Sequence, residues 1–549
     1  MKIKKTYIEV SVFLIVYLFA VYMWTLPFQD NKIPYGEFDA ISHWEIADSF
    51  AQMDRTYVYL PPFIDYSYAG DNRFKPHTLW YPPPFHTDLA MISAFAQDRM
   101  VPIYLTNAVF ASSILISVFF VIRKLFGFLP AILSAFMLAF SMRDIMPYLW
   151  GQWPERFAYA FIPLILYCFY MYFTTYSKEK SKPMYLYIMA LLLAINMMIH
   201  PLAIFHSLIG IFVLGIVLLI KLRKVPFNLK HLSIALMLFL VLFAIFPYQT
   251  GNVFKTFTRE QKSDSEASFS RLFKWSFNPE DFSGSVPASY FSFREMNGLW
   301  TLPFLLLGIL ALAIRRQERD LFLLAWLVSL YLVLHRDIIG KTVLLHRSLS
   351  ATAHIFIPIT VIGVFSIVYF IKIPKNYQVF LKYGAALLIV ALTLVYNMPK
   401  AYSELDNAYD SPLLRLNSEQ IEVSEWLKDN IDENQNVTII GPWQVFPQKF
   451  IQDRYIPDIM QKVWWMASYS HRVSNLFEGF LRWGYWEDNR EVIIRDHIFN
   501  DVIVMDYTDL VLLGNKDLLD YWISFEKQSL ANHTLLYKTD KIRVYKYES

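Results

Sequence analysis

The chain has 549 residues, of which 55% are hydrophobic and 18% are charged. Soluble domains average about 45–50% apolar and about 25% charged residues, so this composition excludes a disordered chain and argues against an ordinary soluble enzyme. The net charge of +3 is too small to indicate binding to nucleic acid. Because Cys168 is the single cysteine, a disulfide within the chain and a thiolate metal cluster are both excluded.

Apolar stretches of the length needed to cross a membrane, about 20 residues, recur through the first 400 positions. They predict eleven membrane-spanning helices, at 7–28, 101–122, 128–142, 156–174, 184–199, 202–220, 231–248, 298–314, 320–335, 348–371 and 379–396. Basic residues cluster in every second connecting loop, which places those loops and the N-terminus in the cytoplasm and the C-terminus outside. We therefore expect an integral protein of the plasma membrane.

Three long segments then face the exterior: the loops 29–100 and 249–297, and the tail that follows the last span. We expect a transmembrane domain over 1–396 and an external α/β domain over 397–549. The tail predicts helices at 418–430, 488–500 and 516–527, strands at 437–440, 502–505 and 510–513, and a closing hairpin of 535–537 with 542–545.

The first external loop carries two amphipathic stretches, at 41–53 and 85–96, which are typical of helices that lie along a membrane surface. Asp39 is placed to cap the first helix, and His43 follows four residues later, on the same face. Two interpretations stay open for Asp39: a helix cap, or a carboxylate that acts as general base or metal ligand. Asp39 and His43 together are candidate ligands of a divalent cation, although two ligands do not make a site.

Two shorter external turns hold further candidates. Asp144 and Glu155 lie between the third and fourth spans, where Glu155 also suits the dipole at the start of a helix. His200 precedes a proline in the turn between the fifth and sixth spans, and His206 follows; for His206 we favour a structural role.

The last external loop ends at Arg347, at the outer start of the tenth span. A cation at a helix N-terminus is disfavoured by the helix dipole by roughly 0.3–1 kcal/mol, so this position calls for a reason. One reason is contact with lipid headgroups. The other is a clamp for the phosphate of a lipid-linked substrate, with His346 and Lys341 assisting, because arginine binds phosphate through paired hydrogen bonds.

A first span followed by a loop with an acidic residue and two membrane-parallel helices resembles the GT-C superfamily of membrane glycosyltransferases, which includes protein mannosyltransferases, aminoarabinose transferases and oligosaccharyltransferases. The nearest resemblance is to functionally uncharacterised archaeal and bacterial GT-C-like proteins. These share an Asp-x-x-x-His in the first loop, here Asp39 and His43, a Gly-x-x-Pro-Glu-like turn, here ending at Glu155, a His-Pro turn, here at His200, and a soluble C-terminal domain.

The resemblance implies a GT-C-like polytopic helical fold and a sugar donor carried on polyprenyl phosphate. Asp39 would be the catalytic carboxylate and Arg347 would bind the carrier phosphate, with His43 and His200 as further substrate contacts. Asp144 or Glu155 would bind the acceptor or a divalent cation such as Mg²⁺ or Mn²⁺.

The tail segment Val463-Trp464-Trp465-Met466-Ala467-Ser468-Tyr469 is close to the Trp-Trp-Asp-Tyr-Gly signature of oligosaccharyltransferases. Met466 stands where the signature has its Asp, so we do not transfer the function of that signature to this chain. Paired aromatics more often fill a core.

The leading prediction is an inverting glycosyltransferase that moves a sugar from a polyprenyl-phosphate donor to a glycan, lipid or protein acceptor on the external face. The alternative is a non-catalytic GT-C-like membrane scaffold with an external binding domain, since fold alone does not determine function. A transporter ranks last, because the predicted spans are nearly free of acidic residues. A cavity shared by Asp39 and Arg347 would favour the enzyme.

Overall fold

The computed structural model of this protein describes most of the chain. The described residues are 5–29, 36, 38–52, 64–65, 83–96, 98–226, 228–244, 298–335, 348–370, 374–408, 415–435, 437–440, 456–472, 474–475, 501–513 and 516–547. They divide into two compact units. The helical unit comprises Met1–Pro27, Tyr81–Phe85 and Tyr104–Ala408, and the sheet unit comprises Phe28–Trp80, His86–Ile103 and Tyr409–Ser549.

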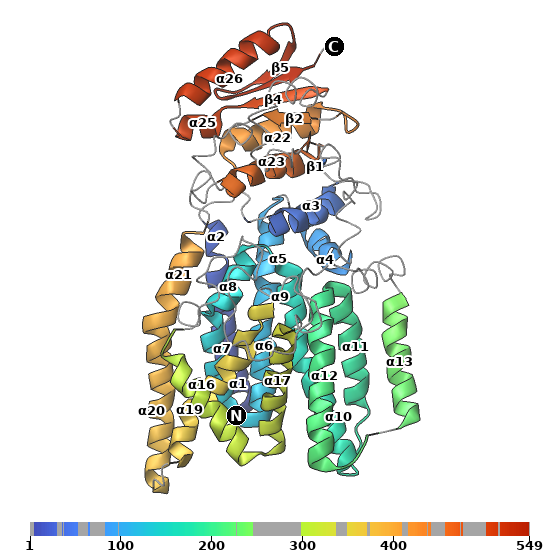
Figure 1. The fold of residues 1–549 in the computed structure, drawn as a ribbon, viewed down its shortest axis with the longest axis vertical. Coiled ribbons are helices and arrows are strands. Elements are labelled where there is room, and N and C mark those ends of the chain that lie inside the picture. Colours follow the sequence, from blue (N-terminus) through green and yellow to red (C-terminus); the bar gives the residue numbers. More distant parts are fainter. Residues whose placement is uncertain are drawn as a thin grey trace. The chain divides into compact units, whose positions relative to one another are not determined.

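The helical unit is built from apolar helices that run side by side (Figure 1). Its elements are α1 (Lys5–Trp24), α5 (Val101–Ser112), α6 (Ile114–Phe126), α7 (Phe128–Ala139), α8 (Met142–Leu149), α9 (Trp153–Tyr159), α10 (Phe161–Ser177), α11 (Met184–Ile199), α12 (Pro201–Leu222), α13 (Leu229–Ala244), α16 (Thr301–Arg315), α17 (Glu318–Leu334), α19 (Thr352–Phe370), α20 (Lys375–Leu392), the π-helix η8 (Thr393–Asn397) and α21 (Met398–Asp406). Two short helices, α2 (Leu26–Gln29) and α4 (Pro83–Ser93), have residues in both units, and the first three residues of α5 belong to the sheet unit.

Five of the described helical stretches are long and apolar enough to cross a membrane. They are Lys5–Trp24, Val101–Phe126, Trp153–Ser177, Leu202–Leu222 and Tyr377–Asp406, and a sixth is added if α7 and α8, which meet at a bend of 41°, form one span. All eleven predicted stretches overlap helices, but several of these are short. A helix of 16 residues is about 24 Å long, less than the roughly 30 Å of a hydrocarbon core. The number eleven and the orientation of the termini stay predictions.

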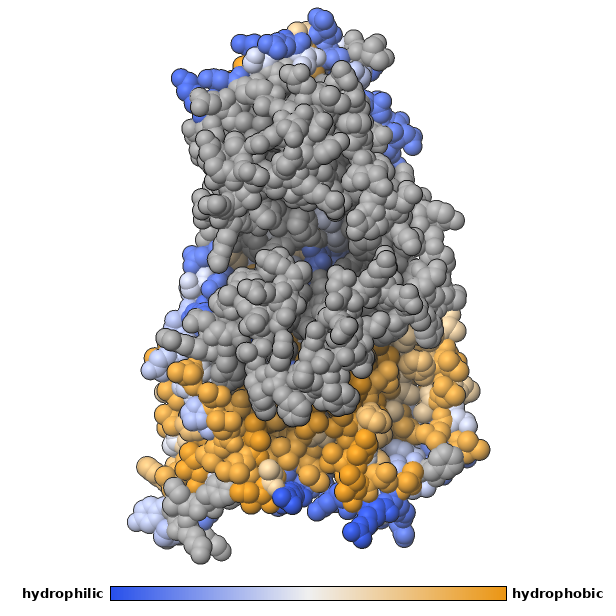
Figure 2. Space-filling view, in the orientation of Figure 1, coloured by the Kyte–Doolittle hydropathy of each residue, from blue (hydrophilic) through white to orange (hydrophobic). Residues whose placement is uncertain are grey.

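The outer surface of the helical unit is hydrophobic. Ile15 of α1 is 69% exposed, and Phe380 of α20 is 81% exposed. On the face drawn in Figure 2, hydrophobic residues cover much of the described surface of this unit. Apolar surface of this extent is typical of helices that face lipid, as in an integral membrane protein.

The sheet unit is a six-stranded mixed sheet with helices packed on it (Figure 1). Its elements are α3 (Phe38–Gln52), β1 (Ile64–Asp65), α22 (Ser418–Asn430), β2 (Val437–Ile440), α23 (Ile456–Ser470), β3 (Ser474–Asn475), β4 (Val502–Asp506), α25 (Thr508–Leu513), α26 (Lys516–Ser529), β5 (Thr534–Lys538) and β6 (Ile542–Lys546).

The strand order is β1-β3-β2-β4-β6-β5. The first four strands run parallel, with Thr438 opposite Ile503, and β6 and β5 complete the sheet in antiparallel pairing. All residues of β2 and β4 are buried, as expected for central strands covered on both faces. β1 belongs to the first long loop, so this sheet includes residues from outside the predicted 397–549 domain. The boundary at 396 stays a prediction.

Most predicted elements of the tail lie where the sequence placed them, namely the helices at 418–430 and 516–527, the strands at 437–440 and 502–505, and the closing hairpin. The predicted strand 510–513 is wrong, because these residues form α25. The Asp506 carboxylate accepts hydrogen bonds from the backbone N–H and the hydroxyl of Thr508, which turns the chain into a helix directly after β4. The predicted helix 488–500 lies outside the described residues.

Candidate functional site

Helix α3 lies in the long segment between α1 and α5 and carries Asp39. Asp39 is the second residue of the helix, so it lies inside the first turn and does not precede it as a cap would. A carboxylate in the first turn is stabilised by the helix dipole. Ala40, Ile41, Trp44 and Ala47 are fully buried at helical spacing, while the Asp39 side chain is half-buried. The buried apolar residues hold the helix and leave Asp39 partly accessible.

His43 lies one turn after Asp39 and contacts a second histidine. Its Nδ1 is 2.9 Å from Nε2 of His86 in α4, and both side chains are buried. One of these two nitrogens must donate the proton of this hydrogen bond and the other must accept it. Within the described residues, no group of three or more His, Cys, Asp or Glu side chains has the geometry to hold a metal ion. A cation bound by Asp39 and His43 stays a prediction.

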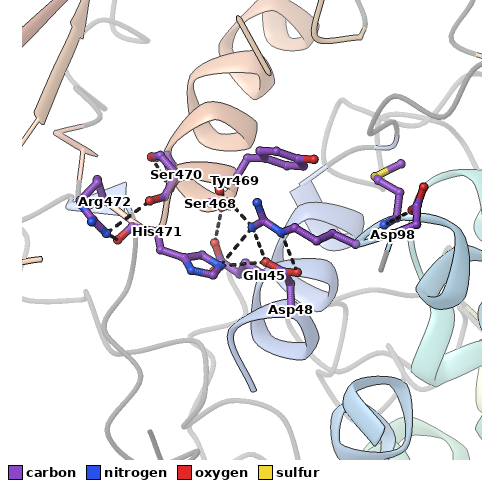
Figure 3. Close-up of polar contacts among 11 residues, drawn as sticks. Glu45, Asp48, Asp98, Ser468, Tyr469, Ser470, His471 and Arg472 are labelled. Atoms are coloured by element: carbon purple, nitrogen blue, oxygen red, sulfur yellow. Dashed lines mark hydrogen bonds and ion pairs between the residues drawn. The ribbon is translucent and has the colours of Figure 1, made fainter. Parts of the chain in front are cut away.

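Two further carboxylates of α3, Glu45 and Asp48, are buried against α23 (Figure 3). Glu45 Oε2 accepts hydrogen bonds from Ser468 Oγ at 2.5 Å and Trp464 Nε1 at 3.0 Å. Burial raises the pKa of the Glu45 carboxyl from 4.5 to about 7, against the opposing effect of these two donors.

Asp48 is held by two basic side chains (Figure 3). Its carboxylate accepts two hydrogen bonds from Arg99, at 3.1 Å and 2.5 Å, and Oδ2 lies 2.8 Å from Nε2 of His471. Burial by itself raises the pKa of Asp48, but Arg99 and His471 outweigh it and hold that pKa below its usual value. For His471, burial is the largest effect and lowers its pKa, in spite of Asp48.

The sequence patterns did not single out Glu45, Asp48, Arg99 or His471. A signal was present, because Glu45 and Asp48 interrupt the apolar face of the predicted helix 41–53. Carboxylates on a face that is to be buried need partners. The partners lie in distant parts of the chain, and sequence spacing does not reveal them.

A second polar cluster lies within the helical unit. Asp144 of α8 is ion-paired with Arg156 of α9, and its Oδ1 lies 2.8 Å from Nε2 of His354 in α19. All three side chains are buried. Charged groups inside a membrane protein are costly and by default mark functional positions. The sequence predicted Asp144 as a candidate, and the structure places it among polar groups. His354 was not predicted, although a histidine within an apolar span could have pointed to it.

Aromatic and imidazole rings extend this cluster. The Tyr159 ring lies 5.1 Å from that of His206 and 6.2 Å from that of His354. His206 Nε2 is 3.1 Å from the Ser348 hydroxyl. The polar groups therefore form a continuous set across α8, α9, α12 and α19, which includes the His206 for which a structural role was expected.

The structure describes two of the remaining predicted residues, Glu155 and His200. Glu155 is buried in the first turn of α9. His200 precedes Pro201 at the start of α12, and its Nδ1 accepts a hydrogen bond from the Leu202 N–H at 3.3 Å, which makes it the helix cap. Lys341, His346 and Arg347 lie outside the described residues, so a cavity shared by Asp39 and Arg347 stays a prediction.

A protein-family match covers residues 6–349, more than half of the chain. The chain belongs to this family, which is a family of unknown function (DUF6541). No curated protein matches this DUF6541 chain.

Solved structures of membrane transferases have a similar fold. The archaeal oligosaccharyltransferase AglB from Archaeoglobus fulgidus, in complex with an inhibitory peptide and a dolichol-phosphate, matches with a TM-score of 0.55 at 12% identity, over 91% of this chain and 70% of its own. The Archaeoglobus fulgidus oligosaccharyltransferase tethered to an acceptor peptide with the NVT sequon matches with a TM-score of 0.56 at 12% identity, over 91% and 69%. ArnT from Cupriavidus metallidurans bound to undecaprenyl phosphate matches with a TM-score of 0.53 at 12% identity, over 98% and 97%.

At an identity of 12%, these matches show a similarity of fold alone. It agrees with the resemblance to the GT-C superfamily that the sequence indicated. The nearer resemblance to GT-C-like proteins with an Asp-x-x-x-His motif and an external domain stays a prediction.

Proposed function

We propose that this chain is a membrane glycosyltransferase that moves a sugar from a polyprenyl-phosphate donor to an acceptor on the external face. One observation carries the proposal: a half-buried carboxylate, Asp39, lies in the first turn of α3, on a chain whose fold is similar to that of transferases solved with lipid phosphates. The N-terminus is then cytoplasmic and the sheet unit external, as the basic loops predict.

In the proposed reaction, the acceptor hydroxyl attacks the anomeric carbon of the donor sugar while Asp39 takes the hydroxyl proton as general base. The bond between the anomeric carbon and the phosphate oxygen breaks, and polyprenyl phosphate leaves. One displacement without a carboxylate nucleophile inverts the configuration at that carbon. Arg347, with His346 and Lys341, would stabilise the negative charge on the leaving phosphate.

Asp144 and Glu155 are proposed acceptor contacts, and His43 and His200 are proposed substrate contacts. The residues as described do not fit a divalent cation, because Asp144 is already paired with Arg156 and His354, and the described residues hold no group of three ligands. Mg²⁺ or Mn²⁺ at Asp39 and His43 is therefore a proposal without a completed ligand set. No step of the reaction above depends on it.

The test is donor consumption by the purified full-length protein in lipid nanodiscs, with a panel of polyprenyl-phosphate sugars. Asp39→Asn is compared with the unmodified protein and with Asp88→Asn, which alters an exposed carboxylate of the same loop. We expect Asp39→Asn to lower turnover by about 10²–10⁴-fold and Asp88→Asn to leave it within twofold. Equal turnover by all three proteins would remove Asp39 from the reaction. No turnover of any donor by the folded unmodified protein would favour the non-catalytic scaffold.

A further inference from the structure

The helix that carries Asp39 is held by α23 through two buried carboxylates on one face. Glu45 and Asp48 are three residues apart, a spacing that puts both on the same side of a helix. Trp464 donates a hydrogen bond to Glu45. Ser468 donates a second one, and His471 contacts Asp48 (Figure 3). Two side chains of α23 therefore contact Glu45, and His471, which directly follows α23, contacts Asp48.

Aromatic rings complete the contact between α3 and α23. The Trp44 ring lies 5.5 Å from that of Trp465 in an edge-on arrangement and 5.5 Å from that of Tyr469 in a stacked one. The guanidinium of Arg99, which binds Asp48, lies 4.1 Å from the centre of the Tyr469 ring. Packing of this kind resists rotation of α3 about its own axis as well as sliding along α23.

A second connection ties the same loop to the sheet. Strand β1 pairs in parallel with β3, with Ile64 opposite Ser474 and Asp65 opposite Asn475. The segment between α1 and α5 is thus joined to the C-terminal part of the chain both by α3 and by a strand. Within this segment, α3 and β1 both contact residues more than 400 positions away.

The polar character of this contact indicates a positional role. Buried charged groups often stabilise a fold less than apolar residues of the same size would, whereas their directional bonds select one arrangement. Asp39 lies six residues before Glu45 and nine before Asp48, which is about 9–14 Å along the helix axis at 1.5 Å per residue. A helix this short is stiff, so fixing Glu45 and Asp48 also fixes the position of Asp39.

We propose that Trp464, Ser468 and His471 are positioning residues, which hold Glu45 and Asp48 and thereby set where the Asp39 carboxylate meets the acceptor hydroxyl. This inference rests on the proposed function of Asp39. It gives the C-terminal part of the chain a defined role in the transfer step, without contact between these residues and the substrate.

The first test separates catalysis from binding in the full-length protein. Ser468→Ala removes the 2.5 Å donor to Glu45, and Trp464→Phe removes the other. We expect kcat to fall about 10–100-fold in each variant with an unchanged KM for the donor, because misplacing a catalytic group by about 1 Å costs up to about 100-fold. Ser468→Thr keeps the hydroxyl and should restore most of the rate.

The matched control is Ser470→Ala. Ser470 is also buried at the end of α23, but its hydroxyl donates to the Ala467 carbonyl of its own helix. Its removal should leave kcat unchanged. A Ser470→Ala variant as slow as Ser468→Ala would show that any disturbance of α23 has the same effect, and would overturn the specific role of Ser468.

The second test does not depend on activity. Hydrogen exchange of peptides that cover Phe38–Gln52 is measured in the same variants, with thermal unfolding as the check of folding. We expect exchange in α3 to be about tenfold faster in Ser468→Ala and Trp464→Phe, and unchanged in Ser470→Ala.

Unchanged exchange in both of the first two variants would overturn the proposal whether or not the protein transfers sugar. Faster exchange with a full rate of transfer would also overturn it, since α3 would then be loosened without consequence. If the unmodified protein consumes no donor, the proposed function fails and with it the assignment of these residues to sugar transfer. The exchange measurement then decides separately whether α23 holds α3.

Discussion

The Nε2 atom of His354 lies 2.8 Å from Oδ1 of Asp144, and this contact joins α19 to α8 inside the helical unit. The same carboxylate is ion-paired with Arg156, and all three side chains are excluded from solvent. An interior cluster of this kind is stable only while its charges balance, because each charge would be costly alone.

Asp144→Ala should therefore destabilise the helical unit by about 3–5 kcal/mol, since Arg156 would keep a buried charge without its carboxylate. Thermal unfolding in detergent measures the loss. The control is Glu318→Gln, which breaks the more exposed pair with Lys178 and should cost less than about 1 kcal/mol. The double change Asp144→Leu with Arg156→Met should recover most of the stability. Equal effects of Asp144→Ala and Glu318→Gln would contradict the expected cost.

Two glycines let α16 and α19 cross at close range. A Cβ on Gly308 would lie 2.2 Å from the Ile359 carbonyl oxygen, and one on Gly363 would lie 1.9 Å from that of Phe304. Gly308→Ala should therefore separate the helices and lower stability by about 1–3 kcal/mol or more.

Gly384→Ala in α20 is the matched control, because a Cβ there meets nothing within 4 Å. It should leave stability unchanged or raise it by up to about 1 kcal/mol. The comparison is made by thermal unfolding, and equal melting temperatures of the two variants would be evidence against the close crossing.

Glu45 should make the stability of the sheet unit depend on pH. Its pKa is raised by burial from 4.5 to about 7, so the folded state favours the protonated form. The stability that this preference contributes is fully present below pH 4.5 and is lost as the pH rises through about 7, to a total of about 3 kcal/mol. Glu45→Gln resembles the protonated form and should melt higher than the unmodified protein at pH 8, but equally at pH 4.5.

Asp48, Arg99 and His471 lie on the same contact. The depressed pKa values of Asp48 and His471 act in the opposite sense, since both contributions are lost as the pH falls. Asp48 and His471 are present in Glu45→Gln as well as in the unmodified protein. The difference between the two melting temperatures therefore reports the contribution of Glu45. A difference that does not change between pH 4.5 and 8 would show that Glu45 does not titrate in this range.

Arg99 should not be replaceable by lysine. Its guanidinium donates two hydrogen bonds to Asp48 and lies over the Tyr469 ring, and a lysine ammonium cannot reproduce the paired bonds. Arg99→Lys should destabilise the sheet unit by about 1–3 kcal/mol in chemical unfolding. A double-mutant cycle with Asp48→Asn tests the cause: the two losses should be strongly non-additive. Additive losses would mean that Arg99 acts through contacts other than Asp48.

The local patterns of the chain predicted its elements well where a periodic signal ran over many residues. The helix 418–430 lies where expected, because helical periodicity is a property of neighbouring residues. The strands at 437–440 and 502–505 also lie where expected, on short runs rich in β-branched residues. The run 510–513 shows the limit. Four consecutive apolar residues suit a strand or a buried helix equally, and the side chains of Asp506 and Thr508 decided for the helix α25.

The sequence by itself determined the class of protein, with its apolar helices, its single cysteine and its acidic residue after the first span, because these are properties of composition and local order. Tertiary structure alone decided the partners of the buried charges: Asp144 with Arg156 and His354, and Glu45 and Asp48 with α23 and Arg99. The physical reason is that a buried charge requires a counter-group in space, and residues as far apart as Asp48 and His471 become neighbours only through folding of the whole sheet unit.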